Sequence, residues 1–281
     1  MGNLVYYVNG QYVAADQAAL GLNDLGIVRG YGVFDLLRTY DGKLFKLHEH
    51  VLRLERSAAL IGLDLPWSTA EIAAIARATY MRNAIANATI RIIVTGGAAD
   101  DFMTPQQRPT LIVMVNPIGT PAPEQKNHGV KVITTRIERM MPTVKSLNYI
   151  TAIMAMQAAR RVGAVEAIYR TADDRITEGT RANFFILRDN RLITPQTDVL
   201  GGITRDVVLE IAGDDFEVVE APLFYADLAT CDEAFLTSST KEILPVTQID
   251  EITIGQGQPG PNTRKLIELF SAYVKLNADS A

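Results

Sequence analysis

A proline-rich segment limits what this sequence can fold into. Residues 116–123 read Asn-Pro-Ile-Gly-Thr-Pro-Ala-Pro, with three prolines and one glycine in eight positions. Proline lacks the backbone N–H that helices and central strands use, so this composition favours a linker. We therefore predict a domain boundary there, with a smaller N-terminal domain over 1–119 and a larger domain over 120–281.

The composition excludes several classes of protein. The chain has 281 residues and a formal net charge of −5, and its basic residues form no cluster, so we expect no nucleic-acid partner. Cys231 is the only cysteine, which rules out an internal disulfide and a cysteine-based metal site. No apolar run approaches the ~18 residues of a membrane span, and the N-terminus has no leader pattern, so we expect a cytoplasmic protein without membrane contact.

Metal binding is also not expected. His48-Glu49-His50 contains two histidines, but they lack the i, i+4 spacing that places both on one face of a helix.

The first domain alternates short strands with helical patterns. Asn9-Gly10 between two alternating runs predicts a hairpin over 4–13. Residues 25–32 contain three glycines and predict an open loop from which Arg29 and Tyr31 protrude, as candidates for lining a pocket. Further strands are predicted over 33–40, 43–47, 89–95 and 110–115, and helices over 48–62 and 68–85, the latter with a Ser68–Glu71 capping box. Arg53 falls in the first of these helices and Arg91 inside a strand.

Lys145 is the first candidate for catalysis. It follows Met141-Pro142-Thr143, which indicates a turn, and precedes a helical pattern over 148–161. The positive end of a helix dipole favours the neutral form of a nearby lysine, and Schiff-base chemistry needs a neutral amine.

Downstream of Lys145, three polar turns stand between apolar runs. Residues 175–183 carry Glu178 in a Gly/Thr-rich turn, and Gly201-Gly202-Ile203-Thr204 opens a helix, an arrangement that suits a phosphate. The run 237–240 offers four hydroxyl groups at the end of a strand. The other predicted elements are strands over 130–135, 166–169, 184–187, 217–220 and 233–237, and helices over 225–229 and 262–275.

Together these motifs carry a resemblance that covers nearly the whole chain. Because the motifs occur in the same order along the sequence, the chain resembles the class IV pyridoxal-phosphate aminotransferases. That family includes D-amino-acid and branched-chain aminotransferases and aminodeoxychorismate lyase. The motifs are Lys145-Ser146-Leu147-Asn148, Thr177-Glu178-Gly179 with Asn183, Gly202-Ile203-Thr204-Arg205-Asp206, and Thr237-Ser238-Ser239-Thr240.

The resemblance implies a fold and a partner. It implies an α+β, two-domain, D-amino-acid aminotransferase-like fold (fold type IV), with a small N-terminal α/β domain and a larger domain with a β-barrel-like core. It also implies a homodimer with the active site near the subunit interface, the Arg29–Tyr31 loop being supplied by the neighbouring subunit.

The resemblance further implies roles around pyridoxal 5'-phosphate. Lys145 would form the Schiff base with the cofactor and then move the substrate proton, and Glu178 would pair with the pyridine nitrogen. The implied phosphate contacts come from Arg53, Ile203, Thr204, Ser239 and Thr240, while Leu200 would pack on the ring and Tyr149 would reach its O3′.

Substrate choice depends on where a carboxylate is held. D-amino-acid enzymes of the family usually carry an Arg-x-His trap after the strand 89–95, which residues 95–101 lack. The chain also departs from the branched-chain pattern, because Leu36 replaces a glycine and Arg181 adds bulk to the turn. We therefore predict a less usual D-amino-acid transaminase that acts on an amino acid and a 2-oxo acid, with the substrate bound by Arg29, Tyr31, Arg91 and Arg181.

Alternatives remain open at this stage. A branched-chain L-amino-acid transaminase comes next, then an (R)-selective amine transaminase or aminodeoxychorismate lyase. A cofactor-free binding protein on the same fold is a different class, and the Lys145–Glu178 pair argues against it.

Overall fold

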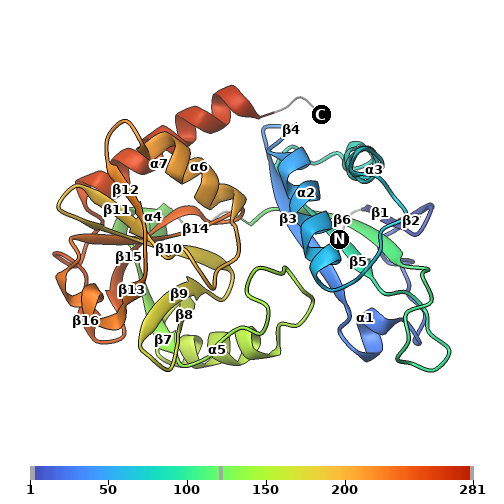
Figure 1. The fold of residues 1–281 in the computed structure, drawn as a ribbon. Helices are drawn as coiled ribbons and strands as arrows, with labels where there is room; N and C mark the ends of the chain where they lie inside the picture. The colour runs from blue at the N-terminus through green and yellow to red at the C-terminus, as the bar shows by residue number, and fades with distance from the viewer. Residues whose placement is uncertain (1–3, 120–122, 279–281) are drawn as a thin grey trace. The chain divides into compact units, whose positions relative to one another are not determined.

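The computed structural model describes residues 4–119 and 123–278, which form two compact units (Figure 1). Unit 1 takes in the chain up to Gly119 and also Val144–Asn148. Unit 2 takes in the chain from residue 123 to Thr143 and Tyr149–Leu276. Lys145 therefore packs with the N-terminal part of the chain, although the residues on either side of its segment belong to unit 2.

Unit 1 is built on a six-stranded antiparallel sheet with the order β2-β1-β6-β5-β3-β4. The hairpin predicted at Asn9-Gly10 is present, and both residues take the positive φ that such a turn requires. The strands are β1 (Val5–Val8), β2 (Gln11–Ala14), β3 (Gly32–Tyr40), β4 (Lys43–Leu44), β5 (Ala88–Thr95) and β6 (Thr110–Pro117). The predicted linker thus begins inside β6, and its residues 120–122 lie outside the described part of the chain.

Helices α2 (Leu47–Leu60) and α3 (Thr69–Met81) pack against this sheet. Their apolar sides share one core with alternate strand residues, among them Val33, Leu37 and Ile90. The Ser68–Glu71 capping box is formed at the start of α3. One expectation was wrong: Leu25–Val28 forms a short helix, α1, because the Asp24 side chain accepts from Gly26 N and caps it.

Unit 2 contains a closed barrel, as the resemblance implied. Neighbouring strands pair in the ring β10-β14-β15-β7-β8-β9, and β9 returns to pair with β10. The ring strands are β7 (Val130–Thr135), β8 (Glu166–Arg170), β9 (Arg175–Gly179), β10 (Ala182–Arg188), β14 (Glu233–Ser238) and β15 (Glu242–Ile249). Flanking strands extend the sheet: β11 (Arg191–Thr194), β12 (Glu217–Glu220), β13 (Leu223–Phe224) and β16 (Ile252–Thr253). Because β9 exists, Glu178 lies on a strand and not in the predicted turn.

The helical segments of unit 2 follow the predicted order, except that the first, over Pro123–His128, was not predicted. They are α4 (Pro123–His128), α5 (Ile150–Arg161), α6 (Ile203–Ala212), η1 (Tyr225–Thr230) and α7 (Pro261–Asn277). Helix α5 packs on β7 and β8 through small residues, Ala152, Ala155 and Ala159. On the same helix, Ile153 is 55% exposed.

Two kinds of feature are absent from the described residues, a membrane-spanning helix and a cluster of metal ligands. No helix in residues 4–119 or 123–278 is both long and apolar enough to cross a membrane. In the same residues no group of three or more His, Cys, Asp or Glu side chains is placed to hold a metal ion.

Candidate active site

The backbone of Lys145 is fixed by the edge of the unit 1 sheet. Phe34 N donates to Lys145 O at 2.9 Å, and Leu147 N donates to Gly32 O at 3.0 Å. A Cβ at Gly32 would lie 2.6 Å from the Val94 carbonyl oxygen, so only glycine lets the strands meet this closely. The segment 145–147 thus covers the part of β3 that β4 leaves unpaired.

The side chains of Lys145 and Arg91 meet the same aromatic ring. Lys145 Nζ lies 4.9 Å from the centroid of the Phe34 ring, and Arg91 Cζ lies 5.0 Å from it. Successive strand residues point to opposite faces, so Phe34 and the residue opposite Arg91, Leu36, share the face away from the core. An amine and a guanidinium group therefore stand on one face of this sheet, held by cation–π contacts.

A row of polar side chains runs along the buried face of α2. His50, Arg53 and Ser57 follow the i, i+3, i+7 spacing of one helix stripe, and all three are buried. Ser57 Oγ accepts a hydrogen bond from Lys145 N at 3.2 Å, which ties the catalytic candidate to this helix.

Asp35 joins the same row from β3. It is fully buried, and it accepts from His50 Nδ1 at 2.6 Å and from two nitrogens of Arg53 at 2.8 Å. Burial alone would raise the pKa of Asp35, but the charges and hydrogen bonds of Arg53 and His50 outweigh it and hold that pKa well below its ordinary value. Burial lowers the pKa of His50 despite the adjacent carboxylate, so the imidazole is neutral and donates from Nδ1. Arg53, the predicted phosphate ligand, is therefore oriented by Asp35.

Arg29 and Tyr31 have other surroundings in unit 1. Arg29 caps the end of α1, is exposed, and donates to Val28 O at 2.9 Å. The Tyr31 hydroxyl donates to Ile61 O at 3.1 Å, and burial raises the pKa of that hydroxyl. These contacts hold the side chains locally, and their substrate role stays a prediction.

In unit 2, Glu178 lies on β9 with only 3% of its surface exposed. Its Oε2 accepts from Leu200 N at 3.1 Å and from Asn183 Nδ2 at 3.4 Å. Its Oε1 accepts from Arg139, which forms an ion pair with it. A buried charge needs such partners, so the site holds an oriented carboxylate at the end of a barrel strand.

The N-terminus of α6 faces the Asn183 side chain. Gly202 is the N-cap, and no side chain caps this helix end. A Cβ at Gly202 would lie 1.9 Å from Asn183 Oδ1, so glycine is required here. Ile203 and Thr204 are the first residues of the helix, and both are buried. Their backbone N–H groups and the helix dipole make this end suitable for an anion.

The hydroxyl cluster lies at the corresponding end of β14. Thr237 pairs with Asn183 in the barrel register, so the turn with Ser239 and Thr240 follows directly from the strand that neighbours Asn183. Thr237 Oγ1 is buried, and it has no hydrogen-bond partner among the described residues. An unsatisfied hydroxyl and an uncapped helix end are the donors that a bound phosphate would use.

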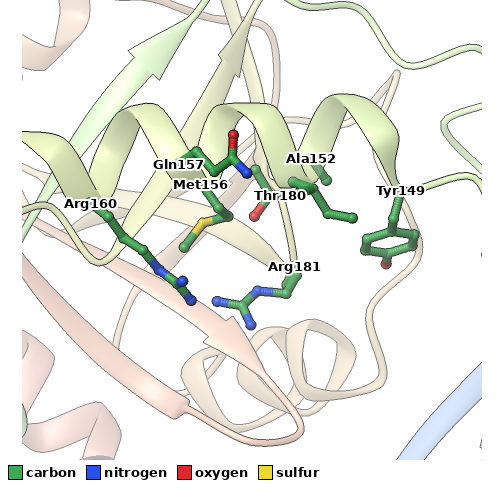
Figure 2. A pocket seen from close by; sticks show the side chains of 8 residues that line it. Tyr149, Ala152, Met156, Gln157, Arg160, Thr180 and Arg181 are labelled. Atoms are coloured by element: carbon green, nitrogen blue, oxygen red, sulfur yellow. The ribbon is translucent and has the colours of Figure 1, made fainter.

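Two remaining candidates line one pocket of unit 2. Tyr149 precedes α5, and Arg181 belongs to the turn between β9 and β10; both face the pocket drawn in Figure 2. Leu200 lies in the loop before α6, and its carbonyl oxygen accepts from Asn183 Nδ2 at 2.8 Å.

The sequence interpretation missed several residues of these clusters. His50 and Ser57 could have been found, because their spacing from Arg53 places three polar side chains on one stripe of a helix. Asp35 is the acidic residue that accepts hydrogen bonds from two of them, His50 and Arg53. Arg139 carries no such signal, because only the folded barrel brings its loop to Glu178.

Comparisons with known proteins show the family to which the chain belongs. The family model described as Amino-transferase class IV matches residues 32–249. A putative branched-chain-amino-acid aminotransferase of Methanocaldococcus jannaschii is 37% identical over 274 residues, covering 94% of each chain. A D-alanine aminotransferase of Staphylococcus epidermidis is 34% identical over 276 residues, covering 96% of this chain and 97% of its own. The solved structure of the Escherichia coli branched-chain amino acid aminotransferase has a TM-score of 0.91 at 26% identity and covers 99% of this chain and 96% of its own.

The chain belongs to the class IV aminotransferase family. It has the fold type IV architecture of that family, which confirms the predicted α+β class, and it is an aminotransferase. Its relatives include both D-alanine and branched-chain enzymes, so family membership leaves the substrate open.

Proposed function

We propose that the chain binds pyridoxal 5'-phosphate and transfers the amino group of a D-amino acid, such as D-alanine or D-glutamate, to a 2-oxo acid such as 2-oxoglutarate. Support for the cofactor comes from the family and from the donors in unit 2, where an uncapped helix N-terminus and the unsatisfied Thr237 hydroxyl suit a phosphate. Ile203, Thr204, Ser239 and Thr240 would hold that phosphate.

Other residues would hold the ring. Glu178 would accept a hydrogen bond from the protonated ring nitrogen and keep it protonated, because Arg139 and Leu200 N hold its carboxylate in place. Leu200 would cover one ring face and Tyr149 would reach O3′. Arg53 would add a phosphate contact from unit 1, with Asp35 fixing its guanidinium plane.

When bound, pyridoxal phosphate supplies an electron sink that stabilises negative charge at the substrate Cα. The chain supplies the proton transfer. Lys145 Nζ would carry the proton that leaves the substrate Cα. Hydrogen bonds of the Lys145 backbone to Phe34 and Ser57 fix the position from which its side chain extends.

The observation that carries the substrate proposal is the shared contact of Lys145 and Arg91 with Phe34. A carboxylate bound by Arg91 would keep the adjacent Cα on the sheet face that presents the amine. Arg91 thus takes the role of the trap that the loop after β5 lacks. Arg29, Tyr31 and Arg181 would complete the substrate pocket.

The preference for D-amino acids rests on two departures from the branched-chain pattern and on a relative. Leu36 stands on β3 where that pattern has glycine, and Arg181 adds a charged side chain to the β9–β10 turn. The Staphylococcus epidermidis relative, a D-alanine aminotransferase, covers 96% of this chain.

A branched-chain L-amino-acid transaminase is the second candidate. The Methanocaldococcus jannaschii relative, at 37% identity, favours it. An (R)-selective amine transaminase and a lyase are further alternatives within the same fold.

One set of assays separates these candidates. The purified chain is supplied with pyridoxal phosphate and 2-oxoglutarate, and glutamate formation is measured with D-alanine, L-leucine or (R)-phenylethylamine. We expect D-alanine to give the highest kcat/KM. A higher value with L-leucine would replace the proposal with the second candidate.

The Arg91 assignment is tested separately by Arg91→Leu. We expect KM for D-alanine to rise about tenfold to a hundredfold, the loss of one charged carboxylate contact. Arg56→Leu, a change at an exposed arginine of α2, is the matched control and should leave KM unaltered. An unchanged KM in Arg91→Leu would exclude Arg91 from the carboxylate site.

We also propose a homodimer in which the Arg29–Tyr31 loop of one copy completes the site of the other. Light scattering on the purified chain should give twice its mass of 30.8 kDa. An active monomer would contradict this assignment.

A further inference from the structure

A buried carboxylate of unit 1 joins α1 to the sheet. Asp24 is 2% exposed, and its Oδ1 accepts from Gly26 N at 2.7 Å. Its Oδ2 accepts from the Thr95 hydroxyl at 2.8 Å and from the Thr110 hydroxyl at 3.1 Å. Among the residues that the structure describes, no Lys, Arg or His side chain forms an ion pair with it. Burying a carboxylate is costly unless hydrogen bonds satisfy it, so these three donors stabilise Asp24 in its place.

The donors belong to α1 itself and to the two strands beside it. Thr95 ends β5 and Thr110 begins β6, and the two residues pair across these strands. Figure 1 shows α1 at this end of the unit 1 sheet. Because Asp24 is also the N-cap of α1, a single side chain caps the helix and ties it to both strands.

Backbone contacts hold α1 close to the end of β5. Leu25 N donates to Gly97 O at 2.9 Å, in the loop that follows this strand. A Cβ at Gly26 would lie 2.4 Å from Thr95 Cγ2, so a larger residue there would push α1 away from β5. The place of α1 on the sheet is therefore fixed by close packing as well as by Asp24.

Arg29 depends on α1 for its position. Its backbone N donates to Leu25 O at 3.0 Å, and Val28 N donates to Asp24 O at 3.0 Å, so the turn runs without a break from Asp24 to Arg29. The Arg29 side chain is exposed, and within the described residues it donates to Val28 O alone. No contact beyond α1 directs this guanidinium group in the described part of the chain, so the backbone of α1 directs it.

We propose that Asp24 is a positioning residue for substrate binding, which sets the direction of Arg29 by fixing α1 to the ends of β5 and β6. The inference rests on the proposed function, in which Arg29 contacts the substrate. Tyr31 depends less on Asp24, because its hydroxyl has a separate anchor at Ile61 O. The loop after β5, which lacks the Arg-x-His trap, serves here as a support for α1.

Asp24→Ser separates capping from anchoring. A serine hydroxyl accepts from the first N–H groups of a helix, so α1 keeps its cap, but this side chain is too short to reach the Thr95 and Thr110 hydroxyls. With the amino acid that gives the highest kcat/KM in the assays above, we expect KM to rise about fivefold to tenfold and kcat to change less than about twofold. Asp24→Asn keeps the cap and the reach to both hydroxyls, so it should hold KM within about threefold of the unmodified chain.

Asp101→Ser is the matched control. Asp101 lies in the loop after β5, and it also accepts from two backbone N–H groups and one hydroxyl, which belong to Met103 and Thr104. These donors lie in its own turn, so the change leaves α1 and its contacts in place. KM should be unaltered in this variant, and an equal rise in Asp24→Ser and Asp101→Ser would overturn the proposal.

Thr110→Val tests the same tie from the strand side and keeps the proposal testable if Asp24→Ser does not fold. Thr110 is only partly buried, and valine has nearly its shape, so the change removes one donor to Asp24 and little else. We expect KM to rise about twofold to threefold. Hydrogen exchange at the Arg29 amide, which donates to Leu25 O, should become faster. Unaltered KM and exchange would overturn the proposal.

A variant that carries two changes shows whether Asp24 acts through Arg29. Arg29→Leu removes the guanidinium group and should raise KM about tenfold or more. When Asp24→Ser is added to it, KM should stay at the value of Arg29→Leu alone, because no group is left to orient.

The outcomes separate this inference from the proposed function. If the two effects multiply, or if KM rises in Arg29→Leu and is unaltered in Asp24→Ser, the positioning role of Asp24 is overturned and the proposed substrate site stands. If KM is unaltered in Arg29→Leu, Arg29 leaves the proposed substrate site and the inference falls with it.

Discussion

Unit 1 and unit 2 each bury one carboxylate in a cluster of candidate residues, but the partners of the two carboxylates come from different kinds of structure. In unit 1, Asp35 on β3 is bound by His50 and Arg53, which lie on successive turns of α2. One strand and one helix are enough to make this cluster, because both partners are displayed on a single helix stripe.

In unit 2, the partners of Glu178 come from three separate segments. Arg139 belongs to the loop after β7, Asn183 to β10, and Leu200 to the loop before α6. This cluster exists only when the barrel is closed. The Asp35 cluster therefore needs only one strand and one helix to be in place, whereas the Glu178 cluster needs the whole barrel of unit 2.

The largest expected effect is on the local cluster. Asp35→Asn would remove the buried negative charge that pairs with Arg53 and should lower the free energy of unfolding by about 3–5 kcal/mol. Urea unfolding followed by circular dichroism measures the change. Asp215→Asn removes a partly exposed ion pair with Lys265 and should cost less than about 1 kcal/mol. Similar changes in the free energy of unfolding in the two variants would mean that the buried cluster stabilises the fold no more than an exposed ion pair does.

Glu178→Gln tests the distributed cluster. The amide cannot pair with Arg139 or stabilise a protonated ring nitrogen, so kcat should fall about a hundredfold or more, and pyridoxal phosphate should bind more weakly. Absorbance titration measures cofactor binding apart from turnover. Glu166→Gln, a change at another buried carboxylate of the barrel, should lower stability and leave cofactor affinity unaltered. Full activity in Glu178→Gln would remove Glu178 from the site.

Gly202→Ala should have a smaller effect confined to cofactor binding. Its methyl group would lie 1.9 Å from Asn183 Oδ1, so Asn183 or the start of α6 must shift. We expect the affinity for pyridoxal phosphate to fall about tenfold, which corresponds to about 1.4 kcal/mol. Gly201→Ala is the control, because a Cβ there meets no atom within 4 Å. Equal losses at both glycines would contradict the proposed phosphate cradle.

The smallest expected effect is a pH dependence of stability. The ordinary pKa of histidine is 6.5, and burial lowers the pKa of His50, so the unfolded chain takes up a proton that the folded chain resists. Stability that depends on neutral His50 is complete above about pH 6.5 and declines as the pH falls toward the lowered value. The slope is below about 1.4 kcal/mol per pH unit. Urea unfolding at several pH values measures this dependence, and His50→Gln should make the decline in the free energy of unfolding less steep. An unaltered slope in the variant would mean that other groups cause the decline.

The sequence could predict local features because neighbouring residues determine them. The Asn9-Gly10 hairpin, the Ser68 capping box and β7 all appear where the pattern predicted them. The barrel-like core followed from the resemblance and not from periodicity.

Other features depended on contacts that the sequence does not display. No strand was predicted over Glu242–Ile249, because Pro245 in its middle is unfavourable for a strand, yet β15 lies between β14 and β7. β9 was missed because Thr177 and Glu178 look like a turn until barrel closure buries them. Lys145 was expected just before a helix, but α5 begins at Ile150 and Lys145 pairs with β3 instead.

The closure of the barrel has a consequence for synthesis. The ring β10-β14-β15-β7-β8-β9 is complete only after Glu233–Ile249 has been made, near the end of the chain. Unit 1 can form its sheet long before that, since its strands lie within the first 119 residues. Pairings between such distant segments form slowly. During synthesis, the Glu178 cluster of unit 2 therefore forms after the sheet of unit 1.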